Sequence, residues 1–239
     1  NGMSLSGLVS LDEGGVDDAG WSISGDFGKI AFGPGAANDG FGATNTGLTA
    51  DEGETLSADY WMTHNDAIPH SDVSITLPAI SGFTLGLGMT DGATSAADGS
   101  QWGVTYAMDA GSMGITVAYA SASDGNNNDQ SSAGVTVTAG DTKVVVATNK
   151  TTASSVTHTA NSIGASYKVS DALTVQGYTG TTELSNNSAY EVTDTAMGLT
   201  YTVTPGLSIS ITNNDFSGKG HASGDESGTR TVVAIDATF

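Results

Sequence analysis

The chain contains no cysteine, only 4 prolines and only 6 lysines and arginines among its 239 residues. The absence of cysteine excludes a disulfide framework and any thiolate ligand or nucleophile. The 6 basic residues are outnumbered by 26 acidic ones, which gives a formal charge of -20. Such a chain repels a phosphate backbone, so nucleic acid is excluded as a partner. No composition shift divides the chain, and we expect a single domain over residues 1–239.

Long apolar runs are also missing. No run is longer than the one that begins at Val144 and ends at Ala147, whereas a membrane-spanning helix needs ~20 apolar residues. A helical membrane protein is therefore excluded, but a β-barrel is not, because its membrane signal is alternation. No secretory signal is visible at Asn1, which predicts a processed chain or a segment of a longer one.

Instead of such runs, the chain has segments in which apolar and polar residues alternate, most clearly at residues 229–239 (TRTVVAIDATF). Successive side chains of a strand point to opposite faces. One face of this segment is mainly apolar and includes Val233 and Phe239, while the other carries both charges, Arg230 and Asp236. The length suits a tilted strand of ~9–11 residues, so we expect the closing strand of a transmembrane barrel.

A hairpin recurs along the chain. Its copies begin at Gly103, Gly134, Gly164 and Gly198, at intervals of about 30 residues. Each copy has a short turn followed by a second alternating strand, and long polar connections, such as residues 149–157, 183–188 and 213–228, separate the copies. Short turns at one end and long connections at the other are typical of outer-membrane barrels. This assignment leaves Asp236 as the only acidic residue within a strand.

The chain predicts about 14 strands, an even number that places both ends in the periplasm. Asn1 and Gly2 have the composition of a turn interior, so one hypothesis is that two N-terminal strands are missing from a barrel of about 16. The alternative is a complete barrel of about 14 strands, in which residues 3–11 pair with residues 229–239.

One segment carries a specific resemblance. The sequence SGDFGKIAFG at residues 24–33 resembles the strand–turn–strand segment that precedes the constriction loop in general bacterial outer-membrane porins, particularly those of alphaproteobacteria. The order of elements remains similar to that family up to Phe239. The resemblance implies an all-β, antiparallel transmembrane β-barrel with a long loop folded into the lumen. It also implies a homotrimer in the bacterial outer membrane that passes small hydrophilic solutes.

Residues 34–71 correspond to that constriction loop. The segment contains six carboxylates and no lysine or arginine. Carboxylates that project into a narrow aqueous pore concentrate cations and repel anions. We therefore expect a cation-preferring channel whose constriction is shaped by Asp39, Asp51, Glu52, Glu54, Asp59 and Asp66.

Porins of the family that this chain resembles carry basic residues on the wall opposite the loop. Alternation predicts that Lys29, Lys168 and Arg230 face inward, with Lys168 near the periplasmic rim. Lys29 and Arg230 are thus the candidates for the basic side of the constriction.

Aromatic residues recur on the predicted outer face near the short turns. Aromatic rings prefer the headgroup region of a membrane, so we expect a periplasmic girdle. Its members are Phe83, Tyr106, Tyr167, Tyr201 and Phe239.

Acidic residues also cluster in the predicted outer loops. Carboxylate oxygens suit a hard cation such as calcium, and the candidate ligands are Asp12, Glu13, Asp17 and Asp18 or the acidic run of residues 51–54. A merely solvated acidic surface is the favoured alternative, because the calcium-loop spacing of an EF-hand is absent. No cofactor is required.

Catalytic signatures are absent. His64 and His70 have no standard zinc spacing, and His158 and His221 fall in predicted outer loops. No nucleophile-elbow motif accompanies the many serines, so we expect no enzyme. The alternative function is a secreted, soluble β-rich protein that binds calcium or mediates adhesion, which requires large side chains on both faces of its strands.

Overall fold

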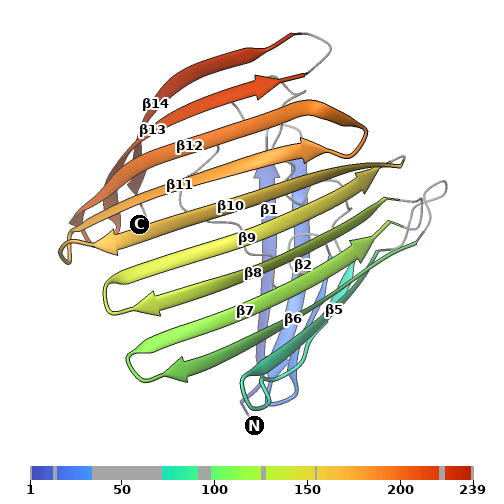
Figure 1. Cartoon of the computed structure of the whole chain (residues 1–239). Coiled ribbons are helices and arrows are strands. Elements are labelled where there is room, and N and C mark those ends of the chain that lie inside the picture. The colour runs from blue at the N-terminus through green and yellow to red at the C-terminus, as the bar shows by residue number, and fades with distance from the viewer. Residues whose placement is uncertain are drawn as a thin grey trace.

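A computed structural model gives the fold of residues 2–12, 15–33, 72–90, 98–124, 128–153, 155–220 and 224–237. These residues form a 14-stranded antiparallel sheet whose strands follow one another in chain order (Figure 1). The strands are β1 (Ser4–Asp12), β2 (Gly15–Gly25), β3 (Gly28–Phe32), β4 (Val73–Thr76), β5 (Phe83–Thr90), β6 (Gly99–Ala110), β7 (Met113–Ser123), β8 (Asp129–Ala139), β9 (Thr142–Ala153), β10 (Val156–Lys168), β11 (Leu173–Leu184), β12 (Asn187–Thr204), β13 (Leu207–Lys219) and β14 (Glu226–Ala237). The predicted strand number and antiparallel order are confirmed.

The short turns lie where the sequence predicted them. Gly111 joins β6 to β7 and Gly140 joins β8 to β9, with φ angles of 70° and 56°. Positive φ angles are required in the tightest hairpin turns, and glycine adopts them without steric cost. The short turns that join β6 to β7, β8 to β9, β10 to β11 and β12 to β13 lie together at one end of the sheet, on the left in Figure 1.

The sheet has one apolar and one polar face. On β5 the side chains of Leu85, Leu87 and Met89 are 36%, 45% and 67% exposed, while Gly86 and Gly88 between them are buried. In the residues that the structure describes, all strands belong to one sheet, and no second sheet packs on the apolar side. None of these residues forms a helix that is long and apolar enough to cross a membrane. The large side chains therefore lie on the outer face, which does not favour the soluble alternative.

The inner face differs between its two ends. Toward the long connections, inward side chains such as Gln101, Thr151 and Thr182 are buried. Toward the short turns, inward side chains such as Lys143 and Thr202 are exposed. The inner wall is thus covered near the long connections and accessible near the short turns.

The two edge strands are not joined to each other. Among the described residues, β1 pairs with β2 and β14 pairs with β13, with no pairing between β1 and β14 (Figure 1). The pairing of residues 3–11 with residues 229–239 that the alternative required is therefore not present in this part of the chain. The hypothesis of two further strands stays a prediction.

The strands extend further than the sequence indicated. Residues 149–157, 183–188 and 213–228 were expected to be connections, but β9 continues to Ala153, β12 begins at Asn187 and has 18 residues, and β13 continues to Lys219. Beyond the apolar band both faces of a strand are polar, so the backbone ladder continues without alternation. The prediction that Asp236 is the only acidic residue in a strand is wrong. The strands also contain Asp12, Asp17, Asp18, Asp109, Asp129, Glu183, Glu191, Asp194, Asp215 and Glu226. Asp12, Asp17 and Asp18 thus belong to β1 and β2 and not to an outer loop as expected.

Candidate pore-lining site

The basic wall candidates lie at different heights. Arg230 lies near the middle of β14, opposite Asn214, and faces inward with it. Lys29 also faces inward but is only one residue from the start of β3, opposite Ser24 and Thr76. The structure thus places Arg230 at mid-wall and Lys29 close to a short turn.

Lys143 is a further inward cation, which was not predicted from the sequence. It lies opposite Thr138 and Ser166 near the start of β9, and its side chain is exposed. Its position could have been found from the alternation, because the flanking Val144 and Val146 belong to the outer face. The short-turn end of the inner wall therefore carries more positive charge than we expected.

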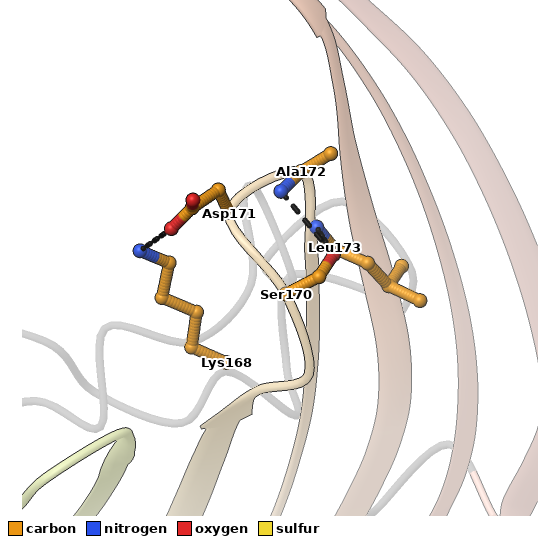
Figure 2. Close-up of polar contacts among 5 residues, drawn as sticks. All are labelled: Lys168, Ser170, Asp171, Ala172 and Leu173. Atoms are coloured by element: carbon orange, nitrogen blue, oxygen red, sulfur yellow. Dashed lines mark hydrogen bonds and ion pairs between the residues drawn. The ribbon is translucent and has the colours of Figure 1, made fainter.

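Lys168 is held at the rim by the turn that follows it. Its Nζ donates a hydrogen bond to Oδ1 of Asp171 at 2.8 Å (Figure 2). In the same turn the Ser170 hydroxyl oxygen accepts hydrogen bonds from the backbone N–H groups of Ala172 and Leu173 (Figure 2). The hydrogen bond and the charge of Lys168 lower the pKa of the Asp171 carboxyl group. The ammonium group of Lys168 thus lies at the short-turn rim.

A carboxylate that the sequence analysis missed lies on the inner wall at mid-height. Asp194 is near the middle of β12 and is 4% exposed, while the neighbouring Thr195 is on the outer face, where its hydroxyl bonds that of Thr179. The hydroxyl of Tyr178 on β11 donates a hydrogen bond to Asp194 Oδ2 at 2.5 Å. The wall at this height therefore carries a carboxyl group as well as the guanidinium group of Arg230.

The expected constriction residues Asp39, Asp51, Glu52, Glu54, Asp59 and Asp66 lie outside the described residues. The two ends of their segment are described. The backbone N–H of Gly33 donates a hydrogen bond to the carbonyl of Asp72 at 2.8 Å, and β3 pairs with β4. Gly33 and Asp72, the residues that flank segment 34–71, thus lie side by side in the wall.

The expected calcium site is not tested. Glu13 and the side chains of Asp12, Asp17 and Asp18 lie outside the described part of the chain, as do residues 51–54. Where the structure does describe side chains, it contains no group of three or more histidine, cysteine, aspartate or glutamate residues that could hold a metal ion. A calcium site stays a prediction.

The structure places four of the expected girdle residues on the outer face near short turns. Phe83 and Tyr106 stack with ring centroids 4.3 Å apart, and Tyr167 and Tyr201 are 49% and 48% exposed. Phe239 lies outside the described residues. That these rings form a membrane girdle stays a prediction.

A second group of outward rings lies near the long connections, and the sequence analysis missed it. Trp21 stacks on Phe32 at 4.3 Å, and Trp102 contacts Tyr119 at 5.3 Å. In each pair the two rings belong to neighbouring strands. The pairs could therefore be recognised only once the strand register was known.

His158 does not lie in an outer loop as expected. It is in β10, and its ring meets the ring of buried Tyr190 edge-on at 6.4 Å on the inner wall. The loop prediction was wrong because strand β10 already begins at Val156, before the residues in which apolar and polar side chains alternate. His64, His70 and His221 lie outside the described residues.

A sheet with an apolar outer face and a polar inner face defines a membrane-spanning, channel-forming class of β-protein. A family model described as Gram-negative porin matches residues 1–221. The chain belongs to the Gram-negative porin family, and its location is the bacterial outer membrane.

Solved structures share the fold at low sequence identity. An anion-selective porin from Comamonas acidovorans is 14% identical with a TM-score of 0.66, over 99% of this chain and 83% of that one. OccAB2 of Acinetobacter baumannii is 12% identical with a TM-score of 0.63, over 99% and 74%. OmpT of Vibrio cholerae is 15% identical with a TM-score of 0.61, over 98% and 82%. No curated protein matches the chain. The alphaproteobacterial type stays a prediction.

Proposed function

We propose that the protein is a general diffusion porin that lets small hydrophilic solutes and ions cross the outer membrane down their gradients. The observation that carries this proposal is the two-faced wall, whose exposed apolar side suits lipid and whose inner side presents threonine, serine, glycine and charged residues. We assign no catalytic step to any residue. The lumen width and the field of its charges determine which solutes pass.

We further propose that residues 34–71 fold into the lumen and make the channel prefer cations. The segment is the longest connection between consecutive strands, and its ends meet at one point of the wall. Inward side chains toward that end of the wall are buried, which requires a cover. The carboxylates of the segment would supply the negative field of the constriction.

Reversal potentials in planar bilayers under a KCl gradient test this proposal. We expect the wild-type channel to prefer potassium, and the triple variant D51N/E52Q/E54Q to lose most of that preference. The control E183Q/E191Q/D215N removes the same number of charges from outward-facing strand positions and should leave the preference unchanged. A wild-type channel that prefers chloride would refute the charge assignment, and the absence of conductance would refute the channel.

We propose a homotrimer as the functional assembly. One solved structure of Vibrio cholerae OmpT, 15% identical to this chain, is described as a trimer form. Light scattering of the detergent-solubilised protein, corrected for bound detergent, should give three times the mass of the chain. A monomer that retains full conductance would contradict this assembly.

A further inference from the structure

A histidine and a threonine lie opposite each other on the inner wall, and each has a buried atom without a partner. His158 of β10 is directly paired with Thr151 of β9, which is 4% exposed. Neither Nδ1 of His158 nor Oγ1 of Thr151 has a hydrogen-bond partner. Directly opposite side chains have Cβ atoms ~4.5–5.5 Å apart, so rotation of the two side chains is enough to bring these atoms into contact.

One proton can satisfy both atoms. A buried polar atom without a hydrogen bond destabilises the folded state. A proton bound to Nδ1 of His158 turns this nitrogen from an acceptor into a donor, and the hydroxyl oxygen of Thr151 can accept its hydrogen bond. Proton uptake from water thus gives each atom the partner that it lacks.

The other neighbours of the imidazole ring are uncharged. Leu184 of β11 is the second direct partner of His158, and the buried ring of Tyr190 of β12 meets the imidazole ring edge-on at 6.4 Å. Thr182 and Val192, which are paired with each other on the same inner face, are 0% exposed. The ring is therefore surrounded by hydroxyl, aliphatic and aromatic groups.

The charged side chains of the neighbouring strands point away from this cluster. Lys150 of β9, Glu183 of β11 and Glu191 of β12 are exposed on the outer face. The nearest inward carboxyl group on these strands is that of Asp194, which lies further along β12 and accepts a hydrogen bond from Tyr178. In the part of the chain that the structure describes, His158 forms no ion pair. A charge on its ring is thus not neutralised by these strands.

This part of β10 lies beyond the apolar band of the outer face. The outward neighbours of His158, Thr157 and Thr159, are polar, and apolar outward residues begin only at Ile163. Burial lowers the pKa of His158 from its ordinary value of 6.5. The ring is therefore neutral in a neutral medium and takes up a proton only in an acidic one.

We infer that His158 and Thr151 form a proton-binding site through which the pH of the external medium sets the ion preference of the channel. The inference rests on the proposed channel function. His158 lies toward the long connections, which are extracellular in barrels of this class. In an acidic medium the imidazolium ring donates a hydrogen bond to Thr151 and places a positive charge on the inner wall, which repels cations. In a neutral medium this charge is absent.

Bilayer measurements at pH 8 and pH 5 test the effect on ions. The chain has 4 histidines, so the variant H64Q/H70Q/H221Q retains only His158. In the wild type and in this variant, we expect the cation-to-anion permeability ratio to fall by up to about fivefold at the lower pH, the effect of one unit charge at ~4 Å in water. H158Q should lose most of this decrease. Resistance of the folded band to SDS before heating would show that each variant folds.

NMR of the imidazole protons in H64Q/H70Q/H221Q gives the titration midpoint of His158 itself. T151V, added to this variant, removes the acceptor for the Nδ1 proton, so the midpoint should shift to lower pH. The control T148V alters an outward position of the same strand and should leave the midpoint unchanged. A midpoint that stays the same or rises in T151V would overturn the inference, because Thr151 would then not stabilise the protonated ring.

The two measurements separate the proton site from the channel. A cation-preferring channel with the same pH response in H158Q and in the wild type would overturn the inference and leave the proposed function standing. Absence of conductance would refute the channel, whereas a lower midpoint in T151V would still support the proton-binding pair.

Discussion

Arg230 of β14 and Asn214 of β13 are directly paired in the sheet, with both side chains on the inner wall at mid-height. The guanidinium group forms no ion pair with any carboxylate that the structure describes. Among the described residues, the inward carboxyl group nearest to it in register is that of Asp194 on β12. Cations that pass this part of the wall meet attraction and repulsion from neighbouring strands.

Removal of this positive charge should increase the cation preference. We expect R230Q to raise the cation-to-anion permeability ratio by up to about fivefold, because one unit charge at ~4 Å in water changes an equilibrium by that factor. The reversal potential in a KCl gradient measures the ratio. K219Q is the control, because Lys219 is exposed at the outer end of β13 beside Glu191. A lower permeability ratio in R230Q would mean that Arg230 maintains the structure of the wall and does not act through its charge on the ions in the lumen.

Phe216 depends on the absence of a side chain at position 228. A Cβ added to Gly228 would approach Phe216 Cζ to 2.7 Å, and the ring would have to move toward Asp194. We expect G228A to lower the free energy of unfolding by ~1–3 kcal/mol, as overpacked sites do. Urea unfolding in lipid vesicles measures this loss. The control G114A lies on the same inner face, where the nearest heavy atom to an added Cβ is 4.0 Å away. Equal stability of the two variants would contradict the packing argument.

The sequence predicted the parts of the fold in which one face is apolar. Leu85, Leu87 and Met89 alternate with small inward residues, so their strand and its orientation could be predicted before the structure was known. Thr193 and Thr195 face outward but are polar. Apolar and polar side chains therefore do not alternate around Asp194, and the sequence did not indicate a strand there. For this reason the outer halves of the long strands could not be predicted from the sequence. Most carboxylates were therefore expected in loops, although Asp194 belongs to the lining.

The outward tryptophans offer a test of the membrane face. Trp21 and Trp102 lie on the outer wall near the long connections, and the chain has 3 tryptophans in all. Aromatic rings at this position should lie at the headgroup level. In a variant that retains only Trp102, lipids brominated near the headgroup should quench its fluorescence more than lipids brominated near the end of the chain.

A matched control for this experiment exists on the same strand. Gln101 is adjacent to Trp102 and faces inward, where it is 8% exposed. In the variant Q101W/W102F, with the other two tryptophans replaced by phenylalanine, brominated lipids should quench little of the fluorescence. Strong quenching from position 101 would show that the assigned faces of β6 are reversed.

The turn between β10 and β11 makes a prediction about pH. Lys168 donates a hydrogen bond to Asp171 at 2.8 Å, and this bond and the Lys168 charge lower the pKa of the Asp171 carboxyl group from its ordinary value of 3.8 (Figure 2). Because the folded-state pKa is lowered, the contact contributes fully to stability above about pH 5, more than one unit above the unfolded value. It is lost as the pH falls through the folded-state pKa.

The chemical shift of the Asp171 carboxyl carbon, followed by NMR from pH 6 to pH 2, should therefore show a midpoint below 3.8. In K168M, which removes both the hydrogen bond and the charge, the midpoint should return toward that value. K143M is the control, because Lys143 is also at the rim but is not among the causes of the shift. Both side chains are exposed, so solvent screens the pair and the unfolding midpoint of D171N should remain close to that of the wild type. A midpoint that is the same in K168M and in the wild type would mean that the ion pair does not persist in solution. Lys168 would then be free to extend into the lumen and add its charge to that of Lys143.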